Sequence, residues 1–372
     1  MIDVAVPEAD RLESAPHPRE TMDLFGQDLA EKTLVDAIQS QRLHHAWLLT
    51  GPKGIGKATL AWRAARFLLA HPASDDWGLL GATAPLTGLF VDPDHPTARR
   101  IAAGSEPGLL SIKRLWDAER KRFKAQITVD EIRRLNSFFG LSATEGGYRV
   151  VIVDSADEMN TSAANALLKV LEEPPKNAVL FLISHQPARL LPTIRSRCRD
   201  LRLQPLASDA LASAVLQAGG AADASDALSE LSGGSVGEAM RLATLDGAGL
   251  YSEIIDLLAT APRMDRQRAA KLAEKAAQRG ADERLDLVLK LMDVALSRLA
   301  LFGAGHPAAR DAAANENQVF ARLSPDLRTA REWAELSRDL GQRLAHGRAV
   351  NIDPASLLMD AFLKINETAA QS

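Results

Sequence analysis

The chain has 372 residues, of which 25% are charged and 46% hydrophobic, and its formal net charge is −4. This length exceeds one ordinary hydrophobic core and predicts two or three domains, and the charge excludes a chain that is basic throughout. A single cysteine, Cys198, excludes a disulfide framework and a four-cysteine zinc module. The longest apolar stretches, such as 178–183, are far shorter than a membrane span, so we expect a cytoplasmic protein.

The first elements in chain order are a leader, a strand and a helix. Residues 1–20 are rich in proline and acidic side chains and have no signal-peptide pattern, so we expect a flexible leader. An apolar run at 45–50 predicts a buried strand, and apolar residues at helical spacing over 60–69 predict a helix. A strand and a helix joined by a glycine loop are the usual setting of a nucleotide-binding loop.

That loop, residues 51–59, matches the pattern G-x-x-x-x-G-K-[ST] except at its last position. In the full pattern, backbone N–H groups surround the phosphates, the lysine reaches the outer phosphates, and the hydroxyl binds Mg²⁺. Ala58 stands at the metal-ligand position, and Thr59 follows one residue too late to point at Mg²⁺. The candidate nucleotide-binding residues of the loop are Gly51, Gly54, Gly56, Lys57, Ala58 and Thr59.

Two further apolar runs predict buried strands that end in polar residues. The run 150–153 ends at Asp154, and the run 178–183 ends at Ser184, with a helical stripe at 163–171 between them. Strands that alternate with helices predict an α/β fold with a parallel sheet covered on both faces. We therefore expect Asp154 and Ser184 to meet Lys57 at the carboxyl edge of the sheet, and they complete the candidate cofactor-binding set.

Two other parts of the chain, 72–126 and 205–372, lack the alternation of strand and helix patterns. The interval 72–126 is irregular and rich in turn residues, which predicts an insertion. From residue 205 onward the strand pattern disappears, a small helical unit is expected over 205–245, and helices follow to the end. Apolar residues over 285–299 form a clear helical stripe.

Hydrolysis of a nucleotide needs positioned phosphates, a metal and an oriented water. Asp154 suits a magnesium ligand, although it also suits a simple cap at the end of a strand. The next position should carry the carboxylate that orients water, and it is Ser155, while Asp157 and Glu158 lie about one helical turn further on. With Ala58, two catalytic parts are missing.

Four segments carry a resemblance to a known family. They are 24–28 (LFGQD), 42–47 (RLHHAW), 167–175 (LLKVLEEPP) and 195–198 (RSRC). Together they resemble the clamp-loader ATPases of bacterial replication, which belong to the AAA+ class. The resemblance implies an AAA+ P-loop domain over 21–204, a three-helix lid over 205–245, and a helical collar over 246–372 that serves oligomerisation.

Departures from the family pattern indicate a subunit that is not a motor. Ala58, Ser155 and Gly237 stand where motor subunits carry a hydroxyl, a carboxylate and the lid arginine. The intact Ser-Arg-Cys motif implies that Arg197 acts as an arginine finger, reaching in trans into the nucleotide site of a neighbouring subunit. Without the family pattern, Arg197 would be read as part of a solvated basic turn.

The resemblance implies a largely non-hydrolysing subunit of the DNA polymerase III clamp loader, without polymerase activity of its own. Its partners would be the ATPase subunits and the delta subunit in a hetero-oligomeric ring, and through the complex the sliding clamp and primed DNA, with no membrane. ATP would be bound weakly or without hydrolysis, Mg²⁺ is left open, and no zinc is expected. The alternatives are an active motor in which Thr59, Asp157 or Glu158 compensates, and a P-loop phosphotransferase, which the long helical C-terminal region disfavours.

Weaker candidates lie in the interval 71–124. His71 and His95 suit zinc poorly because a second pair of ligands is missing, and we interpret them as loop histidines. The basic residues of 113–124 are interrupted by Asp117 and Glu119, which favours a solvated or subunit-facing surface over a DNA contact.

Overall fold

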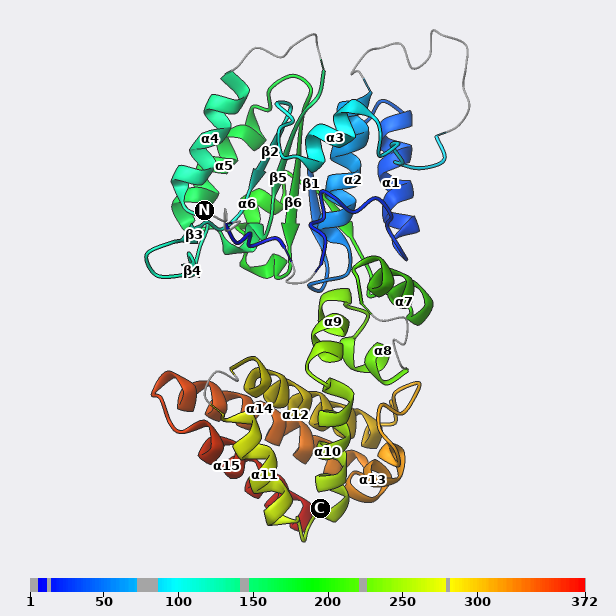
Figure 1. Cartoon of the computed structure of the whole chain (residues 1–372), viewed down its shortest axis with the longest axis vertical. Coiled ribbons are helices and arrows are strands. Elements are labelled where there is room, and N and C mark those ends of the chain that lie inside the picture. Colours follow the sequence, from blue (N-terminus) through cyan, green and yellow to red (C-terminus); the bar gives the residue numbers. More distant parts are fainter. Residues whose placement is uncertain are drawn as a thin grey trace, which may run out of the picture. The chain divides into compact units, whose positions relative to one another are not determined.

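The computed structural model describes residues 6–11, 15–71, 86–140, 147–220, 226–278 and 282–371 (Figure 1). The chain divides into two compact units. Unit 1 contains residues 1–219 and 235–237, and unit 2 contains residues 220–234 and 238–372. The units meet after residues 219, 234 and 237, so they do not test the predicted lid over 205–245 and collar over 246–372, which stay predictions.

Unit 1 is built on a five-stranded sheet with the order β2-β5-β6-β1-β7, in which all pairs are parallel. Every residue of β1 and β6 is buried, as expected for a parallel sheet with both faces covered. This confirms the α/β fold class. The strands are β1 (Ala46–Thr50), β2 (Leu109–Ile112), β5 (Arg149–Val153), β6 (Ala178–Ser184) and β7 (Arg199–Arg202).

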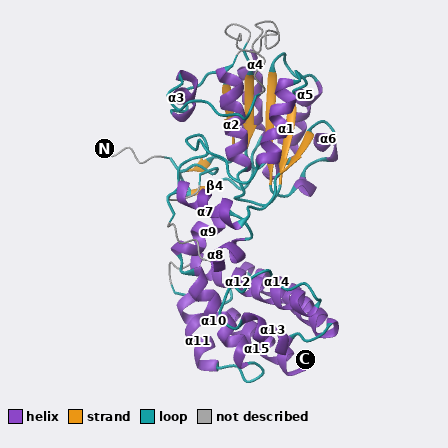
Figure 2. Ribbon diagram, turned by 90° about the vertical axis from the view of Figure 1, so that its right-hand side faces the viewer, coloured by secondary structure: helices purple, strands orange, loops and turns teal. Residues whose placement is uncertain are grey.

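Helices cover both faces of the sheet (Figure 2). Side chains alternate along β1, so that Trp47 packs into the core shared with α1 and α2, and Leu48 packs into the core shared with α4 and α5. The helix α5 begins where the Asn160 side chain accepts the Ala163 N–H. The helices of this unit are α1 (Asp28–Gln39), α2 (Lys57–Ala70), α3 (Pro96–Ala102), α4 (Val129–Gly140), α5 (Thr161–Glu172), α6 (Pro192–Arg195) and α7 (Ser208–Gln217).

Two predictions about unit 1 need correction. The interval 72–126 is more than an insertion, because its described residues contribute α3 and the edge strand β2 of the main sheet. Its other two strands, β3 (Trp116–Asp117) and β4 (Arg122–Phe123), form a separate hairpin. The predicted insertion also includes residues 72–85, which lie outside the described residues. The prediction of a flexible leader over 1–20 is wrong for part of its described residues, because Ala15 and His17 are buried. Residues 1–5 and 12–14 lie outside the described residues.

Unit 2 is helical in its described part. Apolar side chains of the predicted stripe over 285–299 are buried in its core, which confirms that prediction. Among the described residues, no helix is long and apolar enough to cross a membrane. The helices are α8 (Asp226–Ser232), α9 (Val236–Thr244, whose first two residues belong to unit 1), α10 (Gly247–Thr260), α11 (Arg266–Ala276), α12 (Asp282–Gly303), α13 (Glu316–Leu323), α14 (Leu327–Ala349) and α15 (Pro354–Gln371).

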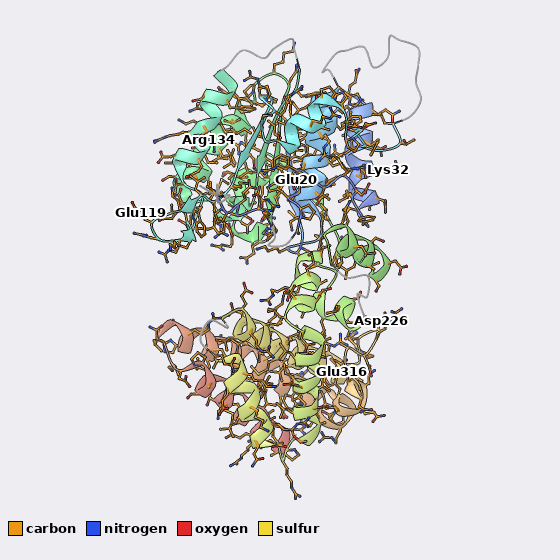
Figure 3. All side chains as sticks on the ribbon, viewed as in Figure 1. Glu20, Lys32, Glu119, Arg134, Asp226 and Glu316 are labelled. Atoms are coloured by element: carbon orange, nitrogen blue, oxygen red, sulfur yellow. The ribbon has the colours of Figure 1, made fainter. Side chains whose placement is uncertain are left out.

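A buried polar network joins three helices of unit 2. Glu316, at the start of α13, accepts hydrogen bonds from the Tyr251 hydroxyl of α10 and from the Arg298 guanidinium of α12. The backbone N–H of Ala312 donates to the same carboxylate. Glu316 is 1% exposed and lies among the helices of unit 2 (Figure 3), so its charge is neutralised inside the protein.

Candidate functional site

The glycine loop connects the end of β1 to the start of α2, as the sequence predicts. Gly51 and Gly54 have φ angles of +135° and +79°, which residues with a side chain rarely adopt. A Cβ at Gly51 would lie 2.7 Å from the carbonyl oxygen of Leu203, and a Cβ at Gly54 would lie 2.3 Å from Oγ of Ser235. The loop therefore requires glycine at both positions, as a phosphate cradle does.

Lys57 turns back onto the loop that would bind phosphate. Its side chain is 3% exposed, and Nζ donates to the carbonyl oxygens of Gly51, at 2.7 Å, and of Pro52. Burial lowers the pKa of Lys57 to about 8, and the negative charge of Asp154 opposes this shift. The ammonium group thus donates its hydrogen bonds to acceptors of the loop itself, in the place where a phosphate would accept them.

The chain also contacts the loop from two distant segments. The Val236 N–H donates to the carbonyl oxygen of Gly54 at 2.9 Å, and Nε2 of Gln27 donates to the carbonyl oxygen of Ile55 at 2.9 Å. Gln27 is 4% exposed and also donates to the carbonyl oxygen of Gln204. The sequence predicts neither contact. Gln27, in the segment 24–28 that resembles the family, is the sequence signal that points to one of them.

Asp154 lies at the carboxyl end of β5, in the predicted position. Burial, and after it the negative charge of Asp10, raises its pKa to about 6. Ser155 Oγ donates to Oδ1 of Asp154 at 3.2 Å. Strands β1 and β5 both run parallel to β6, so Lys57, which follows β1, and Asp154, which follows β5, share the carboxyl edge of the sheet.

Ser184 ends β6 at the same edge. It is fully buried, and its Oγ has no hydrogen-bond partner within the described part of the chain. The next residue, His185, has its pKa lowered to about 4, first by burial and then by the positive charge of Lys57. His185 is therefore a neutral imidazole at physiological pH.

The two carboxylates that follow Ser155 are already engaged. Asp157 is buried and accepts the backbone N–H of His185 at 2.9 Å. Glu158 pairs with Arg114 at 2.6 Å, and burial raises its pKa. Both carboxylates thus already have partners within the chain, which disfavours the compensation that an active motor would need.

The oxygen donors at this edge fit Mg²⁺ poorly. A magnesium ion prefers an octahedral set of oxygen ligands. Ala58 offers no side-chain oxygen, and the hydroxyl of Ser155 is directed at Asp154, which leaves that carboxylate as the main protein ligand. Thr59 follows Ala58 in the first turn of α2, as the sequence places it.

Replacing Asp154 with asparagine should stabilise the chain. The folded pKa of about 6 lies above the 3.8 of an aspartate in water, so the buried carboxylate destabilises the fold above pH 6, and the penalty vanishes as pH falls below 3.8. We expect Asp154→Asn to raise the free energy of unfolding by roughly 1–3 kcal/mol at pH 7. Urea unfolding at pH 7 and pH 4 measures this, and an equal gain at both pH values would contradict the electrostatic cause.

Arg197 lies away from the glycine loop, just after α6. Its Nη1 donates to the carbonyl oxygen of Thr193 at 3.0 Å, and its Nη2 lies 2.9 Å from Oε1 of Glu172. The Arg197 side chain is 36% exposed. The neighbouring thiol of Cys198 has its pKa raised to about 12 by burial, which makes it a poor nucleophile.

The weaker candidates have structural roles. His71 is hydrogen-bonded to the carbonyl oxygen of Phe67, and His95 caps α3 by accepting the Thr97 N–H. Most cations of the basic run 113–124 are paired within unit 1. The pairs are Lys113 with Glu8 and Asp10, Arg114 with Glu158, Arg120 with Asp117, and Lys124 with Glu131.

Comparisons with known proteins agree with the resemblance. Residues 26–207 match the family model described as DNA polymerase III, delta subunit. A DNA polymerase III subunit delta' from Pseudomonas aeruginosa is 36% identical over 62% of this chain and 65% of its own length. The subunit delta' of Bacillus subtilis is 34% identical over 50% of each chain.

A DNA polymerase III subunit gamma/tau from Mycobacterium tuberculosis is 30% identical over 48% of this chain and 28% of its own length. The chain thus spans less than two thirds of the length of these curated relatives. The matched region contains the glycine loop, Asp154 and Arg197. Across residues 26–207, the chain is similar to the family model of the DNA polymerase III delta subunit and to the curated delta' subunits of two bacteria.

Proposed function

We propose that this chain is the delta' subunit of a DNA polymerase III clamp loader. It would take part in a hetero-oligomeric ring with the ATPase subunits and the delta subunit, and would help to place the sliding clamp on primed DNA. The relatives are named as subunits of DNA polymerase III, which supports a multi-subunit setting in the cytoplasm. The observation that carries the proposal is a glycine loop that is complete in shape and closed on itself.

The hydrogen bonds between Lys57 and the glycine loop support an inert nucleotide site. A bound triphosphate would have to detach Lys57 from the Gly51 and Pro52 carbonyl oxygens before its phosphates could reach the ammonium group. Even then, Ala58 and Ser155 would supply neither the metal ligand nor the carboxylate that hydrolysis needs. We infer that ATP binds this chain weakly and is not turned over.

Arg197 gives such a subunit a role in hydrolysis elsewhere. Its guanidinium is partly exposed and is held by a surface ion pair, which is a weak interaction that another anion can replace. The planar guanidinium suits a phosphoryl group, on which it can offset the charge that develops during transfer. We propose that it does so in the nucleotide site of an adjoining ATPase subunit.

The purified chain should show negligible ATPase activity with Mg²⁺, because two catalytic groups are missing and the remaining carboxylates are engaged. The measurement is steady-state phosphate release by the chain alone and again after gamma/tau and delta subunits are added. Lys57→Ala is the control, and it should leave the rate of the lone chain unchanged. Brisk hydrolysis that Lys57→Ala abolishes would instead establish the motor alternative.

A further inference from the structure

The leader packs against the helix that follows the glycine loop. We call residues 6–11 and 15–20 the acidic strap (dark blue in Figure 1). Arg66 of α2 is 1% exposed and donates to the carbonyl oxygen of Arg19 at 2.9 Å. The rings of His17 and Trp62 meet edge to face with centroids 5.5 Å apart. These contacts fix one end of the strap on α2.

The other end of the strap is held by Lys113. Nζ of Lys113 lies 2.7 Å from Oε1 of Glu8 and 2.5 Å from Oδ1 of Asp10. The second carboxylate oxygen of Asp10 lies 3.1 Å from Nε2 of the fully buried His17. The Asp10 side chain is 1% exposed, so this cluster is part of the folded interior.

Lys113 places these carboxylates beside the candidate site. Ile112, the last residue of β2, pairs in register with Val153, and the Asp154 N–H donates to the carbonyl oxygen of Ile112 at 2.8 Å. Lys113 and Asp154 therefore leave adjacent strands side by side, at the carboxyl edge where nucleotides bind in parallel sheets. The negative charge of Asp10 helps to raise the pKa of Asp154, as expected for near neighbours.

The contact with α2 lies one helical turn beyond the metal-ligand position. Trp62 follows Ala58 by four residues, so the two share one face of α2 in successive turns. His17 contacts both Trp62 and Asp10, so the two described parts of the strap meet. The strap is thus attached beside Asp154, through Lys113, and one turn beyond Ala58, near the positions that hold the outer phosphates and their metal ion in a nucleotide-binding loop.

We propose that the acidic strap is an intramolecular inhibitor, which holds the carboxylates of Glu8 and Asp10 over the nucleotide site and keeps the phosphates of ATP out. The strap holds Lys113, a cation at this edge of β2, in ion pairs with Glu8 and Asp10, which a triphosphate would have to displace. Because the strap is tethered to the site that it covers, it competes at a high effective concentration. This inference rests on the nucleotide-site part of the proposed function.

The test compares the full chain with the double variant Glu8→Gln/Asp10→Asn, which keeps the length and shape of the strap. Equilibrium dialysis with ATP, with and without Mg²⁺, measures affinity, and hydrogen exchange of residues 6–20 reports release. We expect ATP to bind at least about tenfold more tightly, and the strap to exchange faster. The control Asp36→Asn/Asp94→Asn removes two exposed carboxylates of unit 1, whose side chains are 59% and 84% exposed, and should leave both readouts unchanged.

A second variant that lacks residues 1–11 removes both carboxylates and keeps the buried His17. It should bind ATP at least as well as the double variant, and circular dichroism confirms that both remain folded. Unchanged ATP affinity in the shortened chain would overturn the strap and leave the proposed function intact, because Ala58 and Ser155 would then account for inertness. Tight ATP binding with hydrolysis by the unaltered chain would overturn both.

Discussion

Replacing Arg197 with alanine should lower the ATPase rate of a reconstituted clamp loader at the adjoining site by a factor on the order of 10³ or more. In the structure the Arg197 guanidinium is partly exposed and pairs with Glu172, outside its own nucleotide site. An exposed pair of this kind contributes at most about 1 kcal/mol, so the guanidinium can exchange Glu172 for a phosphoryl group at small cost. Removing it takes away charge that the transition state needs and leaves the fold of this chain intact.

The measurement is DNA- and clamp-stimulated phosphate release by the assembled complex, with sedimentation to establish that the ring forms. Arg195→Ala is the matched control, because Arg195 is an exposed arginine at the end of α6 in the same turn. Arg197→Lys should restore little of the rate, since an ammonium group lacks the planar fork. Normal turnover by an assembled Arg197→Ala complex would refute the role in trans.

Replacing Glu316 with alanine should destabilise unit 2 by about 3–5 kcal/mol. The carboxylate is 1% exposed and neutralises Arg298, whose Nε lies 2.8 Å away, while the Tyr251 hydroxyl donates to the same group. Without Glu316, the buried Tyr251 hydroxyl loses its acceptor, and the largely buried Arg298 guanidinium loses two of its hydrogen bonds while it keeps those to Glu230 and to the carbonyl oxygen of Arg310. The carboxylate also raises the pKa of Tyr251, and burial is the larger cause of that shift.

Urea unfolding of the full chain, followed by circular dichroism, measures the loss. Glu367→Ala is the control, because Glu367 pairs with Lys364 on the exposed side of α15, with its side chain 59% exposed, and its removal should change stability by less than about 0.5 kcal/mol. A loss below about 1 kcal/mol for Glu316→Ala would show that the network contributes little to the stability of unit 2.

The sequence predicted the centre of the sheet and the glycine loop well. Strands β1 and β6 are buried on both faces, so each appears as an unbroken apolar run. The loop is a local feature in which the glycine positions and Lys57 follow one another along the chain. Local patterns of this kind need no knowledge of the rest of the fold.

The edge strand and the strap could not be predicted in the same way. Strand β2 has one fully buried residue, Ile112, and too few residues to show a period. The strap depends on Glu8 and Asp10 meeting Lys113, more than a hundred residues further along the chain. Contacts of this kind are set by the folded sheet, and the composition of the leader alone suggests a loose segment.

The raised pKa of Cys198 makes the chain convenient for single-molecule work. Maleimide dyes react with thiolates, and this thiol, with a pKa of about 12, stays protonated at neutral pH. A cysteine introduced at an exposed position would therefore carry the fluorophore selectively, with the native cysteine left in place. Distances from such a dye to a labelled partner would follow ring assembly in real time.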